Sequence, residues 1–428
     1  MSARDIRTIH ARRVWDSRGR PTVEAEVTLA DGSCGRAIVP AGASKGTREA
    51  LELRDGGAAF GGLDVLQAIG HVNGEIARAL AGQAADDQAA LDRRLIELDG
   101  TPAKTRLGAN ATLAVSMAAA HAAAASLGLP LYRYLGGDAA TLLPMPQIQI
   151  FGGGAHAGRR VDIQDFMIVC PGARDFRQAL EWTAEVYRHA GLLMQAKGPL
   201  AGVADEGGWW PDFASNEQAL ETLVAAIECA GFVPREQVAI ALDIAASEFG
   251  RGGRYTLALE ARELDADGLI ELLLDWIDKY PIVSIEDPLA EDDPEGFARF
   301  TRAAGKRVQV VGDDFLVSDA VLVREAAARG AANAVLLKPN QRGTLSETLE
   351  AWRAAQALGY AGIVSARSGE TEDTTIVHLA IGWQTGQLKV GSFARGERMA
   401  KWNEALRIEE RLGDRARFAG GAVFGRSR

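Results

Sequence analysis

The chain has few cysteines and no block of basic residues. Cys34, Cys170 and Cys229 are odd in number and lack the spacing of metal ligands, which is typical of a reduced cytosolic protein. The formal net charge is −10 and no Lys/Arg run stands out, which argues against a nucleic-acid-binding surface. We therefore expect neither a disulfide-stabilised secreted domain nor a nucleic-acid partner.

Long hydrophobic runs are also scarce. The opening residues, MSARDIRTIHARR, contain no apolar signal core. The most apolar stretch, ATLAVSMAAAHAAAASLGLPL, is mostly alanine and includes His121, so it predicts a soluble helix in preference to a membrane span. We expect a cytoplasmic protein with no membrane partner.

The pattern that is present divides the chain into two parts. At 428 residues the chain exceeds one average domain. Residues 4–55 read as strands joined by turns and residues 63–128 as helices, which predicts a compact α+β domain. Beyond residue 137, apolar strands alternate with helical segments, which predicts a β/α barrel. The fold class is α/β, with domains at 1–136 and 137–428, and the barrel helices are expected at 175–195, 215–230, 264–279, 294–305, 319–329 and 344–358.

Short apolar runs in the second domain end six times in a polar or charged residue. After a longer first interval, the ends recur at roughly 25 residues, which suits one strand and its return helix. The carboxyl ends of parallel barrel strands meet at one mouth. The sequence therefore predicts an active site from residues at the six ends: Asp243, Glu286, Asp313, Lys338, Ser365 to Ser368, and Lys389.

The strand-end residues have metal-binding and basic character. Asp243, Glu286 and Asp313 supply the hard oxygen ligands that Mg²⁺ prefers, although such carboxylates also cap helices or form salt bridges. Lys338 lies among apolar residues, where burial would lower its pKa and let it act as a base, or it could simply bind an anion. Lys389 could bind an anion or hold the pKa of Lys338 down.

Three further candidates lie near glycine-rich segments. Arg367 with Ser368 suits a phosphate group. Glu206 in ADEGG is either a general acid or a carboxylate that fixes its loop, and His156 in GGGAHAGRR is a candidate lid residue. Together with the strand-end groups they predict removal of a proton beside a carboxylate, Mg²⁺ stabilisation of the enediolate, and acid-assisted loss of a β-hydroxyl group.

These motifs, in this order, resemble the enolase family over nearly the whole chain. They are DSRGRPTVE, GASKG, ELRDG, GANA, GGGAHAG, DEGG, SIEDP, GDD, LLKPNQRGT, RSGETEDT, GQLKVG and AKWN followed by RIEE. The resemblance implies an N-terminal α+β domain, an eight-stranded barrel with an irregular start, two Mg²⁺ ions per site, and dimers or larger assemblies. It also implies a small phosphorylated acid as substrate.

The resemblance also implies a role for each matching residue. Asp243, Glu286 and Asp313 correspond to the ligands of the first metal. Lys338 corresponds to the proton acceptor and Glu206 to the proton donor. Residues that correspond to substrate or lid contacts are Arg367 and Ser368 for the phosphate, Lys389 for the substrate carboxylate, and His156 and Gln164 for the lid and pocket.

Several positions depart from the family pattern. Ala41 replaces the serine that joins the second Mg²⁺, which puts that ion in doubt, and Ala366 replaces the histidine before the phosphate-binding arginine. Asp165 replaces a glutamate and Lys45 a threonine, and we place both with the substrate-binding residues. Further departures are Arg20, Ala204, Trp209, Trp210 and Pro339.

Loss of a side chain that stabilises the transition state, such as the serine at position 41 or the histidine at position 366, lowers the rate by a factor on the order of 10²–10³. The added charge of Lys45 and Arg20, with two tryptophans that would reshape the wall, fits a larger or more anionic partner. This favours a specialised paralogue, for example one that synthesises carboxyphosphonoenolpyruvate in phosphonate metabolism.

Three alternatives stay open. The first is an ordinary glycolytic enolase, which converts 2-phosphoglycerate into phosphoenolpyruvate and water. The second is a non-catalytic enolase-like binding protein, which the retained lysines and carboxylates argue against. The third is a related lyase or racemase without phosphate recognition, which Arg367 and Ser368 argue against.

Overall fold

The N-terminal part consists of a three-stranded antiparallel sheet covered by helices. The computed structural model describes residues 2–425. The sheet has the order β1-β2-β3, and a turn at residues 31–33 connects β2 to β3, where the Leu29 amide donates to the Ser33 carbonyl. The α+β prediction is confirmed. The elements are β1 (Ile6–Trp15), β2 (Pro21–Leu29), β3 (Cys34–Ile38), α1 (Leu66–His71), α2 (Ala77–Leu80), α3 (Gln88–Asp99), α4 (Ala109–Ser126) and α5 (Leu131–Gly136).

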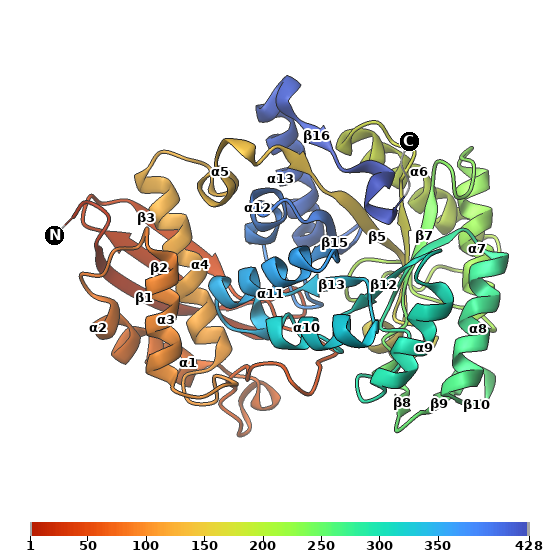
Figure 1. Ribbon diagram of the computed structural model, residues 1–428, viewed down its shortest axis with the longest axis horizontal. Coiled ribbons are helices and arrows are strands. Elements are labelled where there is room, and N and C mark those ends of the chain that lie inside the picture. Colours follow the sequence, from red (N-terminus) through yellow and green to blue (C-terminus); the bar gives the residue numbers. More distant parts are fainter. Residues whose placement is uncertain (1, 426–428) are drawn as a thin grey trace.

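The alanine-rich α4 lies directly on the sheet, as Figure 1 shows. Small side chains let its backbone approach β3 closely: a Cβ added at Gly35 would lie 2.1 Å from the Ala122 nitrogen. Between residues 2 and 425, no single helix has the length and apolar composition needed to cross a membrane. Only α4 taken together with Leu131–Ala139, a pair bent by 91°, meets that test.

The C-terminal part is a closed barrel of eight strands, in the order β11-β12-β13-β14-β15-β5-β6-β7. Strand β6 runs antiparallel to both of its neighbours, and every other pair is parallel. The predicted eight-stranded barrel with an irregular start is confirmed. The strands are β5 (Met145–Gly152), β6 (Asp165–Val169), β7 (Ala239–Asp243), β11 (Ile282–Glu286), β12 (Gln309–Gly312), β13 (Ala334–Leu337), β14 (Ala361–Ser365) and β15 (Gly386–Ser392).

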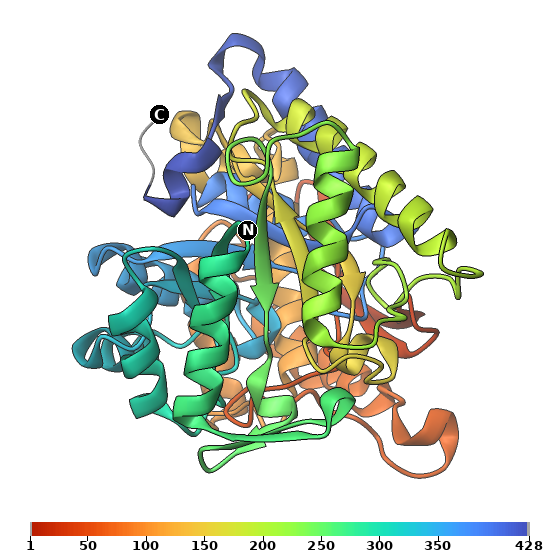
Figure 2. The same ribbon diagram turned by 90° about the vertical axis from the view of Figure 1, so that its right-hand side faces the viewer.

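Helices cover the outside of the barrel, and Figure 2 shows several of them, yellow-green to teal, in front of the strands. Each of the first six begins just after a residue whose side-chain oxygen accepts a hydrogen bond from a backbone amide of the first turn. These N-caps are Asp175, Ser215, Asp265, Asp293, Asp319 and Thr344, so the strand-end carboxylates do not cap these helices. The helices are α6 (Phe176–Gln195), α7 (Asn216–Cys229), α8 (Ala266–Lys279), α9 (Pro294–Ala304), α10 (Ala320–Arg329), α11 (Leu345–Ala357), α12 (Thr375–Gly382) and α13 (Gly396–Leu412).

Two small sheets stand outside the barrel. One contains β8 (Gly250–Arg251), β9 (Arg254–Leu257) and β10 (Arg262–Asp265), and it fills the long first interval between strand ends in the sequence. The other pairs β4 (Leu142–Leu143) with β16 (Arg417–Phe418).

Loops of the N-terminal part reach the barrel after β14. Ala41 and Gly369 exchange two backbone hydrogen bonds, of 2.9 and 2.8 Å. The Ser17 amide donates to the Glu370 carbonyl at 2.8 Å. The motifs DSRGRPTVE, which contains Ser17, and GASKG, which follows Ala41, are thereby brought against the end of the barrel that carries the predicted site.

Candidate active site at the mouth of the barrel

All six predicted positions lie at the mouth of the barrel, and five of them are at or just after the end of a strand, as expected. Asp243 and Glu286 are the last residues of β7 and β11, and Asp313 and Lys338 directly follow β12 and β13. The prediction that the sixth strand ends at Lys389 was wrong. Strand β15 continues past Lys389 to Ser392 and pairs with the long strand β5. Lys389 is nevertheless level with Ser365, the last residue of β14.

Lys389 holds three carboxylates together inside the mouth. Its ammonium lies 2.8 Å from Asp243, 2.9 Å from Glu286 and 3.0 Å from Asp165, and all four side chains are buried. Burial lowers the pKa of Lys389, but Asp243 and Glu286 outweigh it and hold the pKa well above its ordinary value. The ammonium therefore stays charged.

The reversed strand β6 explains how Asp165 reaches this group. Asp165 is the first residue of β6 and pairs with Asp243, the last residue of β7. An antiparallel strand presents its amino end where its neighbours present their carboxyl ends. Burial raises the pKa of Asp165, but Lys389 and His156 outweigh it and hold the pKa well below its usual range.

Lys338 contacts Asp313, the neighbouring strand-end residue. Its ammonium donates to Asp313 Oδ2, while Gln341 Nε2 donates to Oδ1 at 2.9 Å. Burial lowers the pKa of Lys338 as expected, but the Asp313 carboxylate outweighs burial and the net pKa is raised, so the expected low pKa was wrong. The positive charge that lowers the pKa of Lys338 is that of Arg367, and not that of Lys389 as the sequence suggested.

His156 joins the predicted acid to the rest of the site. Its Nδ1 lies 3.2 Å from Asp165 Oδ1, and its Nε2 lies 3.1 Å from Ser368 Oγ and 3.8 Å from Glu206 Oε1. Burial lowers the pKa of His156, whereas Glu206 and Asp165 raise it, and the net pKa is above the ordinary value. The structure therefore places the loop histidine inside the site.

The carboxylates leave acceptor atoms that a cation would satisfy. Glu286 Oε1 and Gln164 Oε1 are buried without a hydrogen-bond partner among the described residues, and Gln164 Nε2 donates to Asp243 Oδ2 at 3.1 Å. Burial and the neighbouring Asp243 raise the pKa of Glu286 well above its usual range, against the effect of Lys389. These residues fit a hard divalent cation.

The three predicted metal ligands do not form one compact group among the described residues: Lys389 contacts Asp243 and Glu286, and Lys338 contacts Asp313. Residues 2–425 contain two groups of acidic and histidine side chains whose ligand atoms lie within 4.8 Å of one another. One is His156, Asp165 and Glu206, and the other is Asp287, Asp313 and Asp314. Asp313 alone belongs to both the predicted set and one of these groups.

Arg367, the predicted phosphate binder, is fully buried and engaged by the protein itself. Its Nη1 lies 3.1 Å from Glu49 Oε2 and 3.0 Å from Asn340 Oδ1, and its Nη2 lies 3.2 Å from Glu49 Oε1 and 2.8 Å from the Ser44 carbonyl. Glu49 and Ser44 belong to the loop after β3. Sequence reasoning missed Glu49, although a carboxylate next to the GASKG segment was a usable signal.

The residues gathered at the mouth enclose about 20 Å³, room for little more than one water molecule. Arg20, Lys45, Trp209 and Trp210 are not among the described residues that line this pocket. They are the substitutions that suggested a reshaped substrate site. Ala366 does line it, and its amide donates to the Lys389 carbonyl at 2.9 Å.

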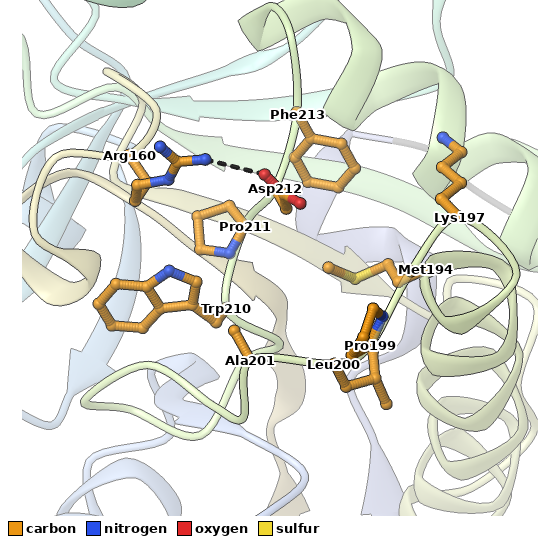
Figure 3. A pocket seen from close by; sticks show the side chains of 11 residues that line it. Arg160, Met194, Lys197, Pro199, Leu200, Ala201, Trp210, Pro211, Asp212 and Phe213 are labelled. Atoms are coloured by element: carbon orange, nitrogen blue, oxygen red, sulfur yellow. Dashed lines mark hydrogen bonds and ion pairs between the residues drawn. The ribbon is translucent and has the colours of Figure 1, made fainter.

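Lys45 and Trp210 face other surroundings. The Lys45 ammonium is 2.5 Å from Glu52, and its side chain is 45% exposed. Trp210 lines a separate pocket of about 320 Å³ next to Arg160, Asp212 and Phe213 (Figure 3). The expectation that these two residues alter the substrate end therefore has no support from their positions.

Both parts of the chain match models of one protein family. The enolase N-terminal domain matches residues 6–135, and the enolase C-terminal TIM barrel domain matches residues 140–426. The protein named Enolase 1 from Desulfitobacterium hafniense (strain Y51) is 51% identical over 422 residues, which cover 98% of this chain and 97% of that protein. With this agreement over both domains, the chain belongs to the enolase family and is a carbon–oxygen hydro-lyase.

Proposed function

We propose that the protein is an ordinary enolase, which converts 2-phosphoglycerate into phosphoenolpyruvate and water. The observation that carries the proposal is the convergence of Lys338, Lys389 and Glu206 with strand-end carboxylates at one buried barrel mouth. The identity of 51% to Enolase 1 favours this activity over the specialised paralogue that the sequence departures had suggested.

Lys338 is the proposed base for the α-proton of the substrate. An amine accepts a proton only when it is neutral, and the contact with Asp313 now stabilises the ammonium. Substrate binding therefore has to separate Lys338 from Asp313. The small free volume of the mouth leads to the same requirement, because a phosphorylated acid fits only if the ion pairs between the two lysines and the carboxylates open.

Glu206 is the proposed acid that protonates the departing β-hydroxyl group. It lies in the loop between α6 and α7 and approaches His156, which also contacts Asp165. Lys389 would neutralise the substrate carboxylate, and Arg367 with Ser368 would receive the phosphate. A substrate held between Lys338 and Glu206 presents its α-proton to one and its β-hydroxyl to the other.

Asp243, Glu286 and Asp313 would hold Mg²⁺, on which the enolase family generally depends. The orphaned Glu286 Oε1 and the hard oxygen donor set fit this ion. When bound, it would supply positive charge that lowers the pKa of the substrate α-proton and of Lys338. Ala41 offers no side-chain oxygen for a second ion, whereas Ser44 of the same loop lines the pocket and carries a hydroxyl group.

The specialised paralogue is the second candidate, and Ala366 is the observation that favours it. This residue lines the pocket at the position where the family pattern has histidine. Asp165, one methylene shorter than the usual glutamate, lies 3.0 Å from the Lys389 ammonium. Both substitutions leave room for a different substrate end.

One assay separates the two candidates. The purified protein is incubated with 2-phosphoglycerate and Mg²⁺, and phosphoenolpyruvate is followed by absorbance. Turnover above ~10 s⁻¹, a typical enzyme rate, supports the ordinary enolase. Slow turnover that Ala366→His combined with Ala41→Ser restores would support the paralogue instead.

Three further properties follow from the sequence and from the family. We propose a cytoplasmic protein, a homodimer or larger assembly as is typical of the family, and a domain boundary between residues 136 and 137. Light scattering of the purified protein tests the assembly, and limited proteolysis tests the boundary.

A further inference from the structure

The contact between Glu49 and Arg367 joins the two domains at the proposed phosphate site. Glu49 comes from the loop after β3, and Arg367 follows β14 of the barrel. The carboxylate engages the guanidinium at two points, of 3.1 and 3.2 Å, and the two side chains are 7% and 2% exposed. A buried two-point contact of this kind fixes the plane of the guanidinium.

The contacts of Arg367 leave one of its five N–H groups for a ligand. The two Nη atoms make four contacts, to Glu49 twice, to Asn340 and to the Ser44 carbonyl. Within residues 2–425, Nε makes no hydrogen bond. A phosphate oxygen can therefore be received at Nε without breaking any of these contacts.

Glu49 is itself held in place. Besides Arg367, its Oε1 accepts from the Gly46 amide at 3.2 Å and from Gln341 Nε2 at 3.3 Å. Gln341 also donates to Asp313 at 2.9 Å and accepts from Ser318 at 2.6 Å. The carboxylate thus joins a continuous buried network that reaches the partner of Lys338.

We propose that Glu49 is a positioning residue for phosphate recognition, which holds Arg367 so that Nε–H is offered to the substrate phosphate. This inference rests on the proposed function, since it takes Arg367 as the phosphate-binding group. It adds a residue from the N-terminal domain to the machinery of the reaction, and it makes docking of the 41–49 loop a condition for tight phosphate binding.

A carboxylate beside a phosphate site could also act as a competitor for the arginine. The network decides against this, because Glu49 is held by four donors and need not leave for Nε to be used. Without Glu49, Asp313 and Asp314 are the next carboxylates that act on the guanidinium. Arg367 would turn toward them and away from the phosphate.

The test compares Glu49→Gln with the unmodified protein in the presence of Mg²⁺. Glutamine keeps the size of the side chain but loses the charge and one acceptor oxygen. The probe is inorganic phosphate, whose Kd is measured by isothermal titration calorimetry, together with KM and kcat for 2-phosphoglycerate. We expect Kd and KM to rise by about 10–100-fold, the range for a lost charge-assisted hydrogen bond, and kcat to fall less than KM rises.

Two variants control for effects on the fold. Glu52→Gln makes the same chemical change three residues along, at a carboxylate that contacts Lys45 and Arg54, and should leave phosphate affinity within about twofold. Glu49→Asp keeps the charge and should recover part of the affinity. If Glu49→Gln does not fold, Glu49→Asp carries the test, because its shorter side chain weakens the two-point contact and must still raise Kd.

The outcomes separate this inference from the proposed function. Tighter phosphate binding by Glu49→Gln would make Glu49 a competitor and overturn the inference, and so would an unchanged Kd. Failure of the unmodified protein to bind phosphate would also overturn it. Absence of 2-phosphoglycerate turnover, with phosphate affinity still dependent on Glu49, would reject the proposed function and leave the inference standing.

Discussion

Lys338 donates a hydrogen bond to Asp313 inside the barrel mouth, which pairs the proposed base with one of the proposed metal ligands. Burial lowers the pKa of Lys338, but the carboxylate outweighs burial and raises it. The same contact lowers the pKa of Asp313 against the effect of its burial. The base is therefore kept protonated until the charge of Asp313 is taken up by another cation.

Replacing Lys338 with methionine should nearly abolish turnover. Methionine retains an unbranched side chain but has no amine, so the α-proton loses its acceptor. General-base catalysis contributes about 10²–10⁴-fold, and kcat for 2-phosphoglycerate should fall by that amount in the phosphoenolpyruvate absorbance assay. Lys306→Met, at an exposed lysine, is the control. A Lys338→Met variant with more than a tenth of the original kcat would contradict the assignment.

Glu206→Gln should separate the two proton transfers. The amide cannot protonate the β-hydroxyl, so formation of phosphoenolpyruvate should fall by about 10²-fold or more. Lys338 is untouched and should still exchange the α-proton of 2-phosphoglycerate with deuterium from D₂O, which NMR detects. Loss of exchange together with dehydration would mean that Glu206 does not act as a separate acid.

Mg²⁺ should stabilise the fold as well as support activity. The carboxylates at the mouth repel one another, and burial with Asp243 raises the pKa of Glu286. A cation present at a free concentration of 100 times its Kd adds about 2.7 kcal/mol to the unfolding free energy. The melting temperature should therefore drop when EDTA removes the ion. Because a raised pKa lets protons compete, the gain should shrink as the pH falls. Glu286→Gln should show a much smaller gain than the unmodified protein.

His378 should make the protein sensitive to acid. Burial and the neighbouring His121 lower the pKa of His378 to about 3, and its Nδ1 has no partner among the described residues. Between about pH 6.5 and about 3 the unfolded chain binds a proton that the folded protein rejects, so the unfolding free energy falls as the pH falls.

The replacement His378→Phe removes this proton and should flatten the dependence. In urea unfolding at pH 7 and pH 5, its stability relative to the unmodified protein should improve at pH 5, by up to about 1.4 kcal/mol per pH unit. His10→Gln, at an exposed histidine on β1, should not change the slope in this way. Equal slopes for His378→Phe and the unmodified protein would reject the explanation.

Gly35→Ala should disrupt the contact between β3 and α4. The added methyl group would lie 2.1 Å from the Ala122 nitrogen and 2.2 Å from the Ala118 oxygen, and backbone atoms cannot move aside cheaply. We expect a loss of about 3 kcal/mol, at the upper end of the range for overpacking, measured by urea unfolding. Gly70→Ala in α1 meets nothing within 4 Å and should be neutral or slightly stabilising. Similar effects of both changes would refute the close-packing argument.

The strand-end pattern predicted more of the site than any single motif did. Asp243, Glu286, Asp313 and Lys338 lie where the apolar runs end, since a buried parallel strand has a period and an end that the sequence displays. Strand β6 was not visible in this way, because its polar residue precedes the apolar run and the strand is reversed.

The pairing of charges was beyond the reach of the sequence. Burial alone suggested a lowered pKa for Lys338, and the sign reversed because Asp313 is close enough to outweigh burial. The two tryptophans and Lys45 lie next to or within the motifs DEGG and GASKG, yet none of the three lines the pocket. Trp209 stacks on Tyr187, Trp210 lines a separate pocket, and Lys45 contacts Glu52. The position of a residue next to a site motif in the sequence does not determine the direction of its side chain.

The sequence by itself determined the barrel, the α+β domain in front of it, the family and the chemical types of the site residues. These follow from local periodicity and ordered motifs, which depend on neighbours along the chain. Only the tertiary structure decided which carboxylate each cation contacts, including the contact of Glu49 with Arg367 across the two domains. Electrostatic contacts act over a few ångströms in space, and two residues that are 318 positions apart meet only once the fold is complete.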